Sequence, residues 1–183
     1  LPHILLGLMH KPVSGYDIRK AFESTLSFFW SANLAQIYPA LKKLEADGLT
    51  RSWTEPSSKG PERRVYQQTE EGRRELARWL SEGPMVAAER RHYLAQVFFL
   101  GQVEDLVDAR AFFETLRDEM MLRRDRLDAQ DEPEAESPAD DTDEAFFEHL
   151  VFQLGQDIFK TYVRWAEDAV ARLEARERGE ARD

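Results

Sequence analysis

Side chains that can hydrogen-bond to the edges of bases gather in a short stretch around residue 40. Asn33 and Gln36 carry amides suited to bidentate contact with adenine, and Lys42 and Lys43 suit guanine edges or phosphates. The hydroxyl of Tyr38 can donate a hydrogen bond to a phosphate oxygen. The same stretch is also compatible with a polar helix surface that contacts only water. The elements that surround it therefore decide between the two interpretations.

The apolar residues of this stretch recur at helical spacing, which predicts an amphipathic helix over residues 35–49. The residues that share its apolar face are Leu34, Ile37, Leu41 and Leu44. Pro39 lies near the expected start, where a missing N–H is tolerated, and Gly48 lies just past the end, where a left-handed residue closes the last turn. The pattern predicts a short helix with one polar face.

A β-hairpin is expected directly after this helix, over residues 49–69, with a Ser-, Gly- and Pro-rich turn at 56–61. Lys59, Arg63 and Arg64 flank the turn and can contact phosphates or a narrow minor groove. Because side chains alternate across a strand, Arg63 and Arg64 are expected on opposite faces. At most one of these two arginines is then directed at DNA from the strand, and the other is a surface charge.

Further helices are expected on both sides of these elements. Two precede them, one over residues 1–10 and one capped by Ser14, and another follows from Thr69 to Gly83. The order helix, helix, recognition helix, wing is a helix-turn-helix variant in which the third helix enters the major groove. The sequence therefore predicts a winged helix-turn-helix domain over residues 1–83.

Three segments resemble the PadR family, the phenolic-acid-responsive regulators of bacteria. They read LLGLMHKPVSGYDIRKAFE, IYPALKKLEADGL and RRVYQQTEEGRRELARWL, and the resemblance is close over the first half of the chain. The second half is similar in pattern to the longer C-terminal dimerisation region of the subfamily related to virulence regulators. Gln36 and Gln68 depart from the small and the aliphatic residue that are usual in the family. The resemblance implies a DNA-binding regulator that responds to planar aromatic effectors.

The composition separates the two halves by charge. Of the net charge of −10, residues 1–83 contribute 12 Lys/Arg and 10 Asp/Glu, or +2, and residues 84–183 contribute 13 and 25, or −12. The electrostatic field of this charge distribution is expected to orient the first half toward DNA and to repel DNA from the second half.

Several classes of function find no support in the sequence. The absence of cysteine removes disulfides and thiolate chemistry, and no HExxH, phosphate-loop or GxSxG motif occurs, so neither an enzyme nor a cofactor is expected. A single Glu89-x-x-His92 pair is too few ligands for a metal. No apolar run approaches the roughly 18 residues of a membrane span, so a soluble, cytoplasmic protein is expected. Since the chain begins at Leu1 and not at Met, we expect that a few natural residues precede it.

Long amphipathic helices are expected in the second half, residues 84–183, at about 87–100, 103–129 and 143–178. The acidic segment 128–145, which holds nine acidic and no basic residues, is expected to be a mobile loop. Helices of this length cannot bury their apolar faces alone, so we expect a homodimer. The predicted fold is mostly α with a small β-hairpin, a winged helix-turn-helix followed by a long-helix dimerisation domain.

Aromatic and aliphatic residues of these helices are the candidates for the subunit interface. The expected interface residues are Phe98, Phe99, Phe113, Leu116, Phe147, Leu150, Leu154, Ile158 and Trp165. Tyr93, Phe152, Phe159 and Tyr162 are the candidates for a pocket that binds a small aromatic ligand, with a dry dimer core as the alternative.

The sequence as a whole predicts a transcriptional regulator that binds double-stranded DNA. A repressor acting as a homodimer on an inverted-repeat operator fits the predicted architecture best. Two other interpretations stay open: an acidic helical dimer that serves as a protein-interaction adaptor without binding DNA, and a carrier of aromatic ligands.

Overall fold

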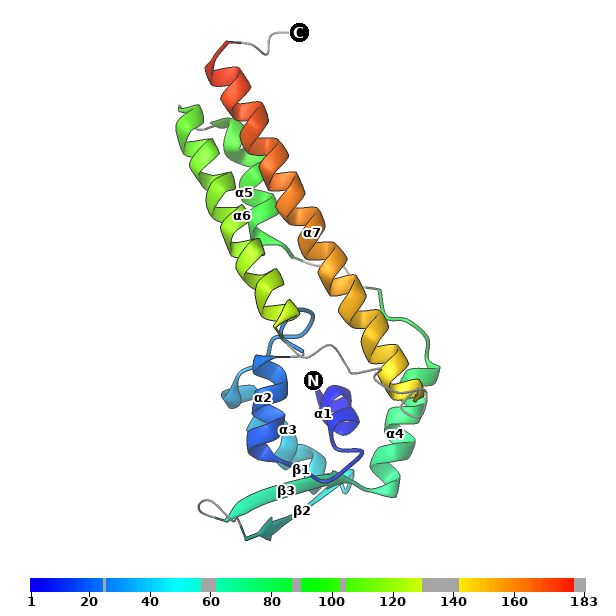
Figure 1. The fold of residues 1–183 in the computed structure, drawn as a ribbon. Helices are drawn as coiled ribbons and strands as arrows, with labels where there is room; N and C mark the ends of the chain where they lie inside the picture. Colours follow the sequence, from blue (N-terminus) through cyan, green and yellow to red (C-terminus); the bar gives the residue numbers. More distant parts are fainter. Residues whose placement is uncertain (25, 57–61, 87–89, 103–104, 130–141, 180–183) are drawn as a thin grey trace. The chain divides into compact units, whose positions relative to one another are not determined.

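The computed structural model describes residues 1–24, 26–56, 62–86, 90–102, 105–129 and 142–179. Contacts along the backbone divide the chain into two compact units, Leu1–Ala87 and Ala88–Asp183. Helices predominate in both, and the first also contains a small antiparallel sheet, as Figure 1 shows. The predicted fold class, mostly α with a small amount of β structure, is confirmed.

The described part of the first unit contains four α-helices and three strands. They are α1 (Pro2–Leu8), β1 (Val13–Ser14), α2 (Gly15–Glu23), α3 (Leu34–Ala46), β2 (Thr50–Glu55), β3 (Arg63–Gln68) and α4 (Glu70–Ser81). Ser14 caps α2 as expected, because its side-chain oxygen accepts a hydrogen bond from the Asp17 N–H. The order of elements is that of a winged helix, with α3 in the place of the recognition helix and β2–β3 as the wing.

The sheet has one strand more than the predicted hairpin. Its order is β1–β3–β2, all antiparallel, and Val13 and Ser14 of β1 pair with Tyr66 and Val65 of β3. A two-residue strand offers no alternation of apolar and polar side chains, so no pattern in the sequence indicates it. Strand β1 makes β3 the central strand, so β3 is fixed on both sides.

The core of the first unit joins α1, α2, α3 and β3. Its buried residues are Leu5, Leu6, Met9, Ile18, Phe22, Ile37, Leu41, Leu44 and Tyr66. Three of the four residues on the predicted apolar face of α3 are therefore buried. The fourth, Leu34, is 41% exposed, because it is the first residue of the helix and lies outside the packed turns.

The end of α3 is joined tightly to the start of α4. Gly48 has the left-handed φ of 73° that was expected of it. Thr69 donates a hydrogen bond through its hydroxyl to the Gly48 carbonyl (2.7 Å) and through its N–H to the Leu49 carbonyl (3.0 Å). The Thr69 hydroxyl also accepts from the N–H of Gly72 (3.1 Å). Any Cβ at Gly72 would lie 2.0 Å from the Leu49 carbonyl oxygen, so only glycine fits there.

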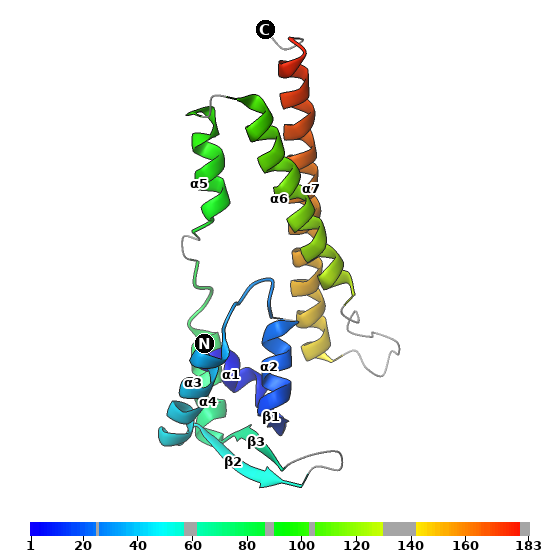
Figure 2. The same ribbon diagram turned by 90° about the vertical axis from the view of Figure 1, so that its left-hand side faces the viewer.

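The second unit consists of α5 (His92–Phe99), a 3₁₀ turn (Leu100–Gln102), α6 (Leu106–Asp128) and α7 (Asp143–Glu177). Helices α6 and α7 lie side by side along much of their length in both Figure 1 and Figure 2. Apolar residues recur along α6 at heptad spacing, at Leu106, Ala109, Phe113, Leu116, Met120 and Leu127. All of them except Leu106, the first residue of the helix, are buried. The partner helix that its heptad spacing requires is thus α7 of the same chain.

Helix α7 has two apolar faces, and the single chain covers one of them. The buried face consists of Phe152, Gly155, Phe159, Val163 and Ala166. A second apolar stripe in the first half of the helix is exposed, and it consists of Phe146, Phe147, Leu150, Val151 and Leu154. We call this stripe the exposed α7 face. Phe147, Leu150 and Leu154 of the predicted interface lie on the exposed α7 face, whereas Trp165, which is also predicted there, contacts Phe113 of α6.

Most of the predicted acidic loop, residues 130–141, lies outside the described residues. Of the helices that the structure describes, none combines the length and the apolar character that crossing a bilayer would require.

Candidate nucleic-acid interface

Helix α3 carries its polar residues on two different sides. Tyr38, Lys42 and Glu45 follow one another at helical spacing and line the same surface hollow. Tyr38 is exposed, and Lys42 has no ion-pair partner among the described residues. Lys43 lines a different cavity, and its Nζ lies 2.9 Å from Oδ2 of Asp47. The structure therefore separates two lysines that the sequence placed together.

Asn33 and Gln36 form the N-terminal cap of α3. Oδ1 of Asn33 accepts from the Gln36 N–H, and Oε1 of Gln36 accepts from the Asn33 N–H, each at 3.1 Å. This reciprocal pair is a capping box. It engages both amide oxygens at the helix start, whereas bidentate contact with adenine needs the oxygen and the nitrogen of one amide.

The two wing arginines lie on opposite faces of β3, as the alternation predicts. Arg63 pairs across the hairpin with Glu55 (3.2 Å), its neighbour in register on β2. Arg64 is directed toward α3 instead and pairs with Glu45 (2.7 Å). Lys59, the third predicted wing contact, lies outside the described residues. Of the two described arginines, Arg64 is the one that shares a surface with the recognition helix.

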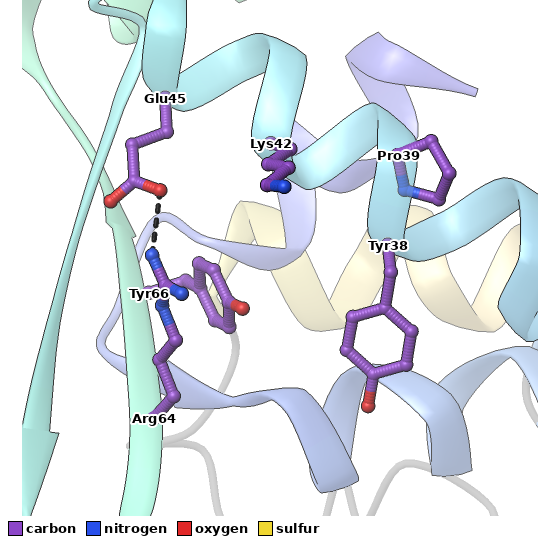
Figure 3. Close-up of a pocket in the computed structure, with 6 residues that line it drawn as sticks. All are labelled: Tyr38, Pro39, Lys42, Glu45, Arg64 and Tyr66. Carbon is purple, nitrogen blue, oxygen red and sulfur yellow. Dashed lines mark hydrogen bonds and ion pairs between the residues drawn. The ribbon is translucent and has the colours of Figure 1, made fainter.

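A cluster of three side chains, Glu45, Ser52 and Arg64, connects α3 to the wing, and Figure 3 shows the Glu45–Arg64 pair of this cluster. Oε2 of Glu45 accepts from Nη2 of Arg64 at 2.7 Å, and Oε1 accepts from the Ser52 hydroxyl at 2.5 Å. The Ser52 oxygen in turn accepts from Nε of Arg64 at 2.9 Å. The hydrogen bond from Ser52 and the nearby Arg64 charge lower the pKa of Glu45, which keeps its carboxyl ionised.

The surface between α3 and β3 is hollowed by a cavity of about 360 Å³, which we call the α3–β3 hollow. It is lined by Tyr38, Pro39, Lys42, Glu45, Arg64 and Tyr66, as Figure 3 shows. The Arg64 guanidinium carbon lies 5.5 Å from the centroid of the Tyr66 ring. Burial raises the pKa of Tyr66, so its hydroxyl stays neutral. The hollow thus presents two cations, one carboxylate and two phenol hydroxyls.

Pro39 occupies a different place in α3 than its sequence position suggested. It lies in the second turn and not at the helix start, so the Ala35 carbonyl has no N–H donor at residue 39. The proline ring is one of the groups that line the α3–β3 hollow.

Glu45, Ser52 and Tyr66 belong to this site although they were not among its predicted residues. A signal for all three was present in the sequence. Glu45 follows Lys42 by three residues on the same side of a helix, and Ser52, Arg64 and Tyr66 share one face of the hairpin once its register is known.

The predicted interface residues of the second unit fall into two groups. Phe98 is 82% exposed and Leu154 is 58% exposed, and Phe99, Phe147 and Leu150 are exposed as well. Phe113 and Leu116 are each only 8% exposed in the single chain, where they pack in the α6–α7 seam. Ile158 and Trp165 are partly buried, and the Trp165 ring contacts Phe113 edge to face at 5.4 Å.

The four candidates for an aromatic pocket are also divided. Phe152 and Phe159 are buried within the paired helices of the single chain. Tyr93 of α5 contacts Tyr162 of α7 edge to face, with 5.8 Å between the ring centroids. The Arg91 guanidinium carbon lies 5.4 Å from the Tyr162 centroid. Tyr93 and Tyr162 therefore form one aromatic contact, and the two phenylalanines belong to the core of the helix pair.

No group of three His, Asp or Glu side chains in the described parts of the chain is arranged to hold a metal ion. Glu89, one half of the single Glu-x-x-His pair, lies outside those parts.

A winged helix with a cationic surface between recognition helix and wing, followed by long helices, defines a transcriptional regulator of the helix-turn-helix class. Residues 4–78 match the transcriptional regulator PadR-like family, and residues 89–174 match the virulence activator alpha C-terminal family. The negative transcriptional regulator PadR of Bacillus subtilis is 30% identical over 182 residues, which are 95% of this chain and 97% of that protein. The chain belongs to the PadR-like family of transcriptional regulators.

Solved structures of the Bacillus subtilis protein are similar over nearly the whole chain. The crystal structure of PadR in complex with operator DNA has a TM-score of 0.78 and 27% identity, covering 94% of this chain and 98% of that one. The crystal structure of the same regulator in complex with p-coumaric acid has a TM-score of 0.73 and 27% identity, covering 95% and 98%.

Proposed function

We propose that this regulator is a repressor that binds an inverted-repeat operator as a homodimer and is released by a small aromatic effector. The observation that carries the proposal is the α3–β3 hollow, where Lys42 of the recognition helix and Arg64 of the wing present their charges on one surface. A recognition helix that enters the major groove brings such a surface against phosphates and base edges.

The DNA contact is assigned to the side of α3 that bears Tyr38 and Lys42, together with Arg64. The operator complex of the Bacillus subtilis relative supports DNA binding by this fold, which the two chains share over nearly their whole length. Lys42 is suited to a guanine edge or a phosphate, and Tyr38 is suited to a phosphate. Asn33 and Gln36 act first as the cap of α3, and their amide NH₂ groups stay available for contacts with the backbone of the DNA.

The homodimer is supported by the exposed α7 face. Phe147, Leu150 and Leu154 form one apolar stripe, and Phe98 and Phe99 add apolar surface on α5 of the same unit. An exposed apolar stripe of this kind on a single chain is typical of a subunit interface. A two-fold dimer would set two α3 helices about one DNA turn apart, roughly 34 Å, and an inverted-repeat operator follows from that symmetry.

The effector is proposed to be a planar aromatic acid. The Bacillus subtilis relative has been crystallised with p-coumaric acid, which has a phenol ring and a carboxylate. In this chain, Tyr93, Tyr162 and Arg91 place aromatic faces beside a cation, as recognition of such a molecule requires. Binding there would shift the spacing of the two recognition helices and lower operator affinity, because DNA demands a fixed spacing. The site of action is the cytoplasm, where the DNA lies.

The test begins with selection of duplexes from a random pool by the purified chain, followed by footprinting of the tightest one. We expect protection of two inverted half-sites whose centres are about one helical turn apart. Titration of p-coumaric acid into that complex should then release the DNA. Recovery of no preferred duplex would contradict the DNA-binding proposal, and a preferred duplex without two-fold symmetry would contradict the dimeric mode of binding. A complex unaffected by p-coumaric acid would remove that acid from the effectors.

A further inference from the structure

The geometry points to Glu45 as a specificity-determining residue that holds Arg64 for operator contact and weakens binding to all other DNA. This inference rests on the proposed DNA-binding function. It assigns a role to an acidic side chain in the middle of a cationic surface, where charge attraction alone would favour a neutral or basic residue.

Arg64 is held in place by two hydrogen bonds in the chain without DNA. Its Nε and one Nη2 hydrogen face the Ser52 oxygen (2.9 Å) and Oε2 of Glu45 (2.7 Å), so one edge of the guanidinium is occupied. The guanidinium carbon also lies over the Tyr66 ring, 5.5 Å from its centroid. The remaining edge, formed by Nη1 and Nη2, has no partner among the described residues. That edge has the geometry that pairs with a guanine or with a phosphate.

Restricting Arg64 before DNA binds reduces the conformational entropy that is lost on binding. A free arginine has many rotamers, and immobilising it on DNA opposes binding. Glu45 and Ser52 have already restricted Arg64 in the chain without DNA, so less freedom is lost when the operator binds. This smaller loss of entropy strengthens binding only where a DNA group lies within reach of the Nη1–Nη2 edge of Arg64. That condition is met when α3 is bound at its operator.

The Glu45 carboxylate also reduces the positive charge of the α3–β3 hollow. DNA of unrelated sequence is held mainly by the attraction between phosphates and cations. Glu45 subtracts one charge from a hollow in which Lys42 and Arg64 supply two, and thereby weakens this sequence-independent attraction. Specificity is the difference between the affinity for the operator and the affinity for unrelated DNA. A residue that strengthens operator binding and weakens binding to unrelated DNA therefore raises specificity in two ways.

Two substitutions separate the two effects. Glu45→Gln keeps the length and one oxygen acceptor, which can serve Arg64 or Ser52 but not both, and it removes the charge. Glu45→Asp keeps the charge but shortens the side chain, so it cannot reach both partners. Glu70→Gln is the matched control, because Glu70 is an exposed carboxylate of α4 that pairs with Arg73 outside the α3–β3 hollow.

The experiment measures affinity for two duplexes at several salt concentrations: the tightest duplex that the wild-type chain selects from a random pool, and a scrambled duplex of equal length. For Glu45→Gln we expect about five- to tenfold tighter binding to the scrambled duplex near 0.1 M salt, with a salt slope steeper by about one. For Glu45→Asp we expect scrambled-duplex binding like that of the wild type and operator binding weakened about fivefold or more. Glu70→Gln should match the wild type on both duplexes.

Two negative results of this experiment lead to different conclusions. If the wild-type chain discriminates between the duplexes and both Glu45 variants keep its affinities and salt slopes, the role of Glu45 is wrong and the proposed function stands. If the wild-type chain binds both duplexes equally, the proposed function is wrong and this inference falls with it. Circular dichroism melts of each variant establish that a loss of affinity is not a loss of fold.

Discussion

At the scale of single residues, the clearest test comes from Lys42 and Lys43, which are neighbours in the chain but have different surroundings. Lys42 lines the α3–β3 hollow, and Lys43 pairs with Asp47 on another side of the helix. We expect Lys42→Ala to weaken operator binding by about 1–3 kcal/mol if the lysine contacts a base edge. A phosphate contact would instead weaken binding to all sequences alike and reduce the salt slope by about one.

Lys43→Ala serves as the matched control for this experiment. It removes the same side chain from the same helix, and we expect a much smaller loss of operator affinity in gel-shift or fluorescence titrations. Equal losses of operator affinity in the two variants would mean that the DNA does not contact the Lys42 side of α3 in preference to the Lys43 side. An unchanged binding curve for Lys42→Ala would remove Lys42 from the interface.

The residue types at the site were predictable from the sequence, but not all of their roles. The positions of Lys42 and of Arg64 follow from helical spacing and strand alternation. The capping role of Asn33 and Gln36 was also within reach, because an N-cap residue followed three positions later by Gln is the capping-box spacing. The Glu45–Ser52–Arg64 cluster required the register of the wing, which the sequence alone does not fix.

At the scale of elements, the junction of α3, β2 and α4 explains a glycine of the TEEG segment. We expect Gly72→Ala to lower the free energy of unfolding by about 2–4 kcal/mol, because the added Cβ would overlap the Leu49 carbonyl oxygen. Thermal or urea unfolding measures this. Gly7→Ala in α1 is the control, since a Cβ there meets no atom within 4 Å. A Gly72→Ala variant as stable as Gly7→Ala would show that the junction is not as tight as described.

Helices α1 and α4 are joined by a contact that should depend on pH. The His3 ring stacks on Trp79 at 4.8 Å, and its Nε2 lies 3.0 Å from Oε1 of Glu75. Hydrogen bonds from Arg78 and from His3 lower the pKa of Glu75 from 4.5 to about 2. Since the folded-state pKa lies below the unfolded one, this carboxylate stabilises the fold above pH 4.5, and the stabilisation is lost as the pH falls toward 2.

The corresponding measurement is the free energy of unfolding between pH 2 and pH 5 for the wild type and for Glu75→Gln. We expect a shallower decrease at low pH in the variant, because its amide does not titrate. Glu62→Gln is the control, since Glu62 makes no ion pair with another described residue. Parallel curves for the wild type and Glu75→Gln would contradict the assigned role of Glu75.

Among the elements, those with a long periodic pattern or a cap were predictable. Helix α7 spans Asp143–Glu177 against an expected 143–178, and α4 begins after the predicted cap Thr69. Strand β1 has two residues and forms only because β3 is beside it, so no local pattern indicates it. Helix α5, expected from residue 87, begins at His92.

At the scale of the whole molecule, the exposed α7 face leads to a prediction about assembly. We expect the wild-type chain to sediment as a dimer and Leu154→Glu to sediment as a monomer, because a buried unpaired carboxylate opposes association strongly. Gln153→Glu adds the same charge at an exposed polar position and should stay dimeric. A dimeric Leu154→Glu variant would place the interface elsewhere, and a monomeric wild type would contradict the proposed assembly.

The sequence predicted that the long helices need partners, but not which partner covers which face. The heptad spacing of α6 has the same appearance whether the second helix comes from the same chain or from another. Phe113 and Leu116 are expected at the subunit interface, whereas in the single chain they already pack in the α6–α7 seam. The distinction requires the tertiary structure, because α7 has apolar residues in two registers.

The central claim, sequence-specific DNA binding by the α3–β3 surface, is tested most directly by gel-shift titration with the promoter region of the chain's own gene. A scrambled fragment of equal length is titrated in parallel, at two salt concentrations. We expect the promoter fragment to bind at least about tenfold more tightly than the scramble, and both affinities to fall as salt rises. Equal affinity for the two fragments, with no dependence on salt, would contradict the claim and favour a protein-binding role for this winged helix.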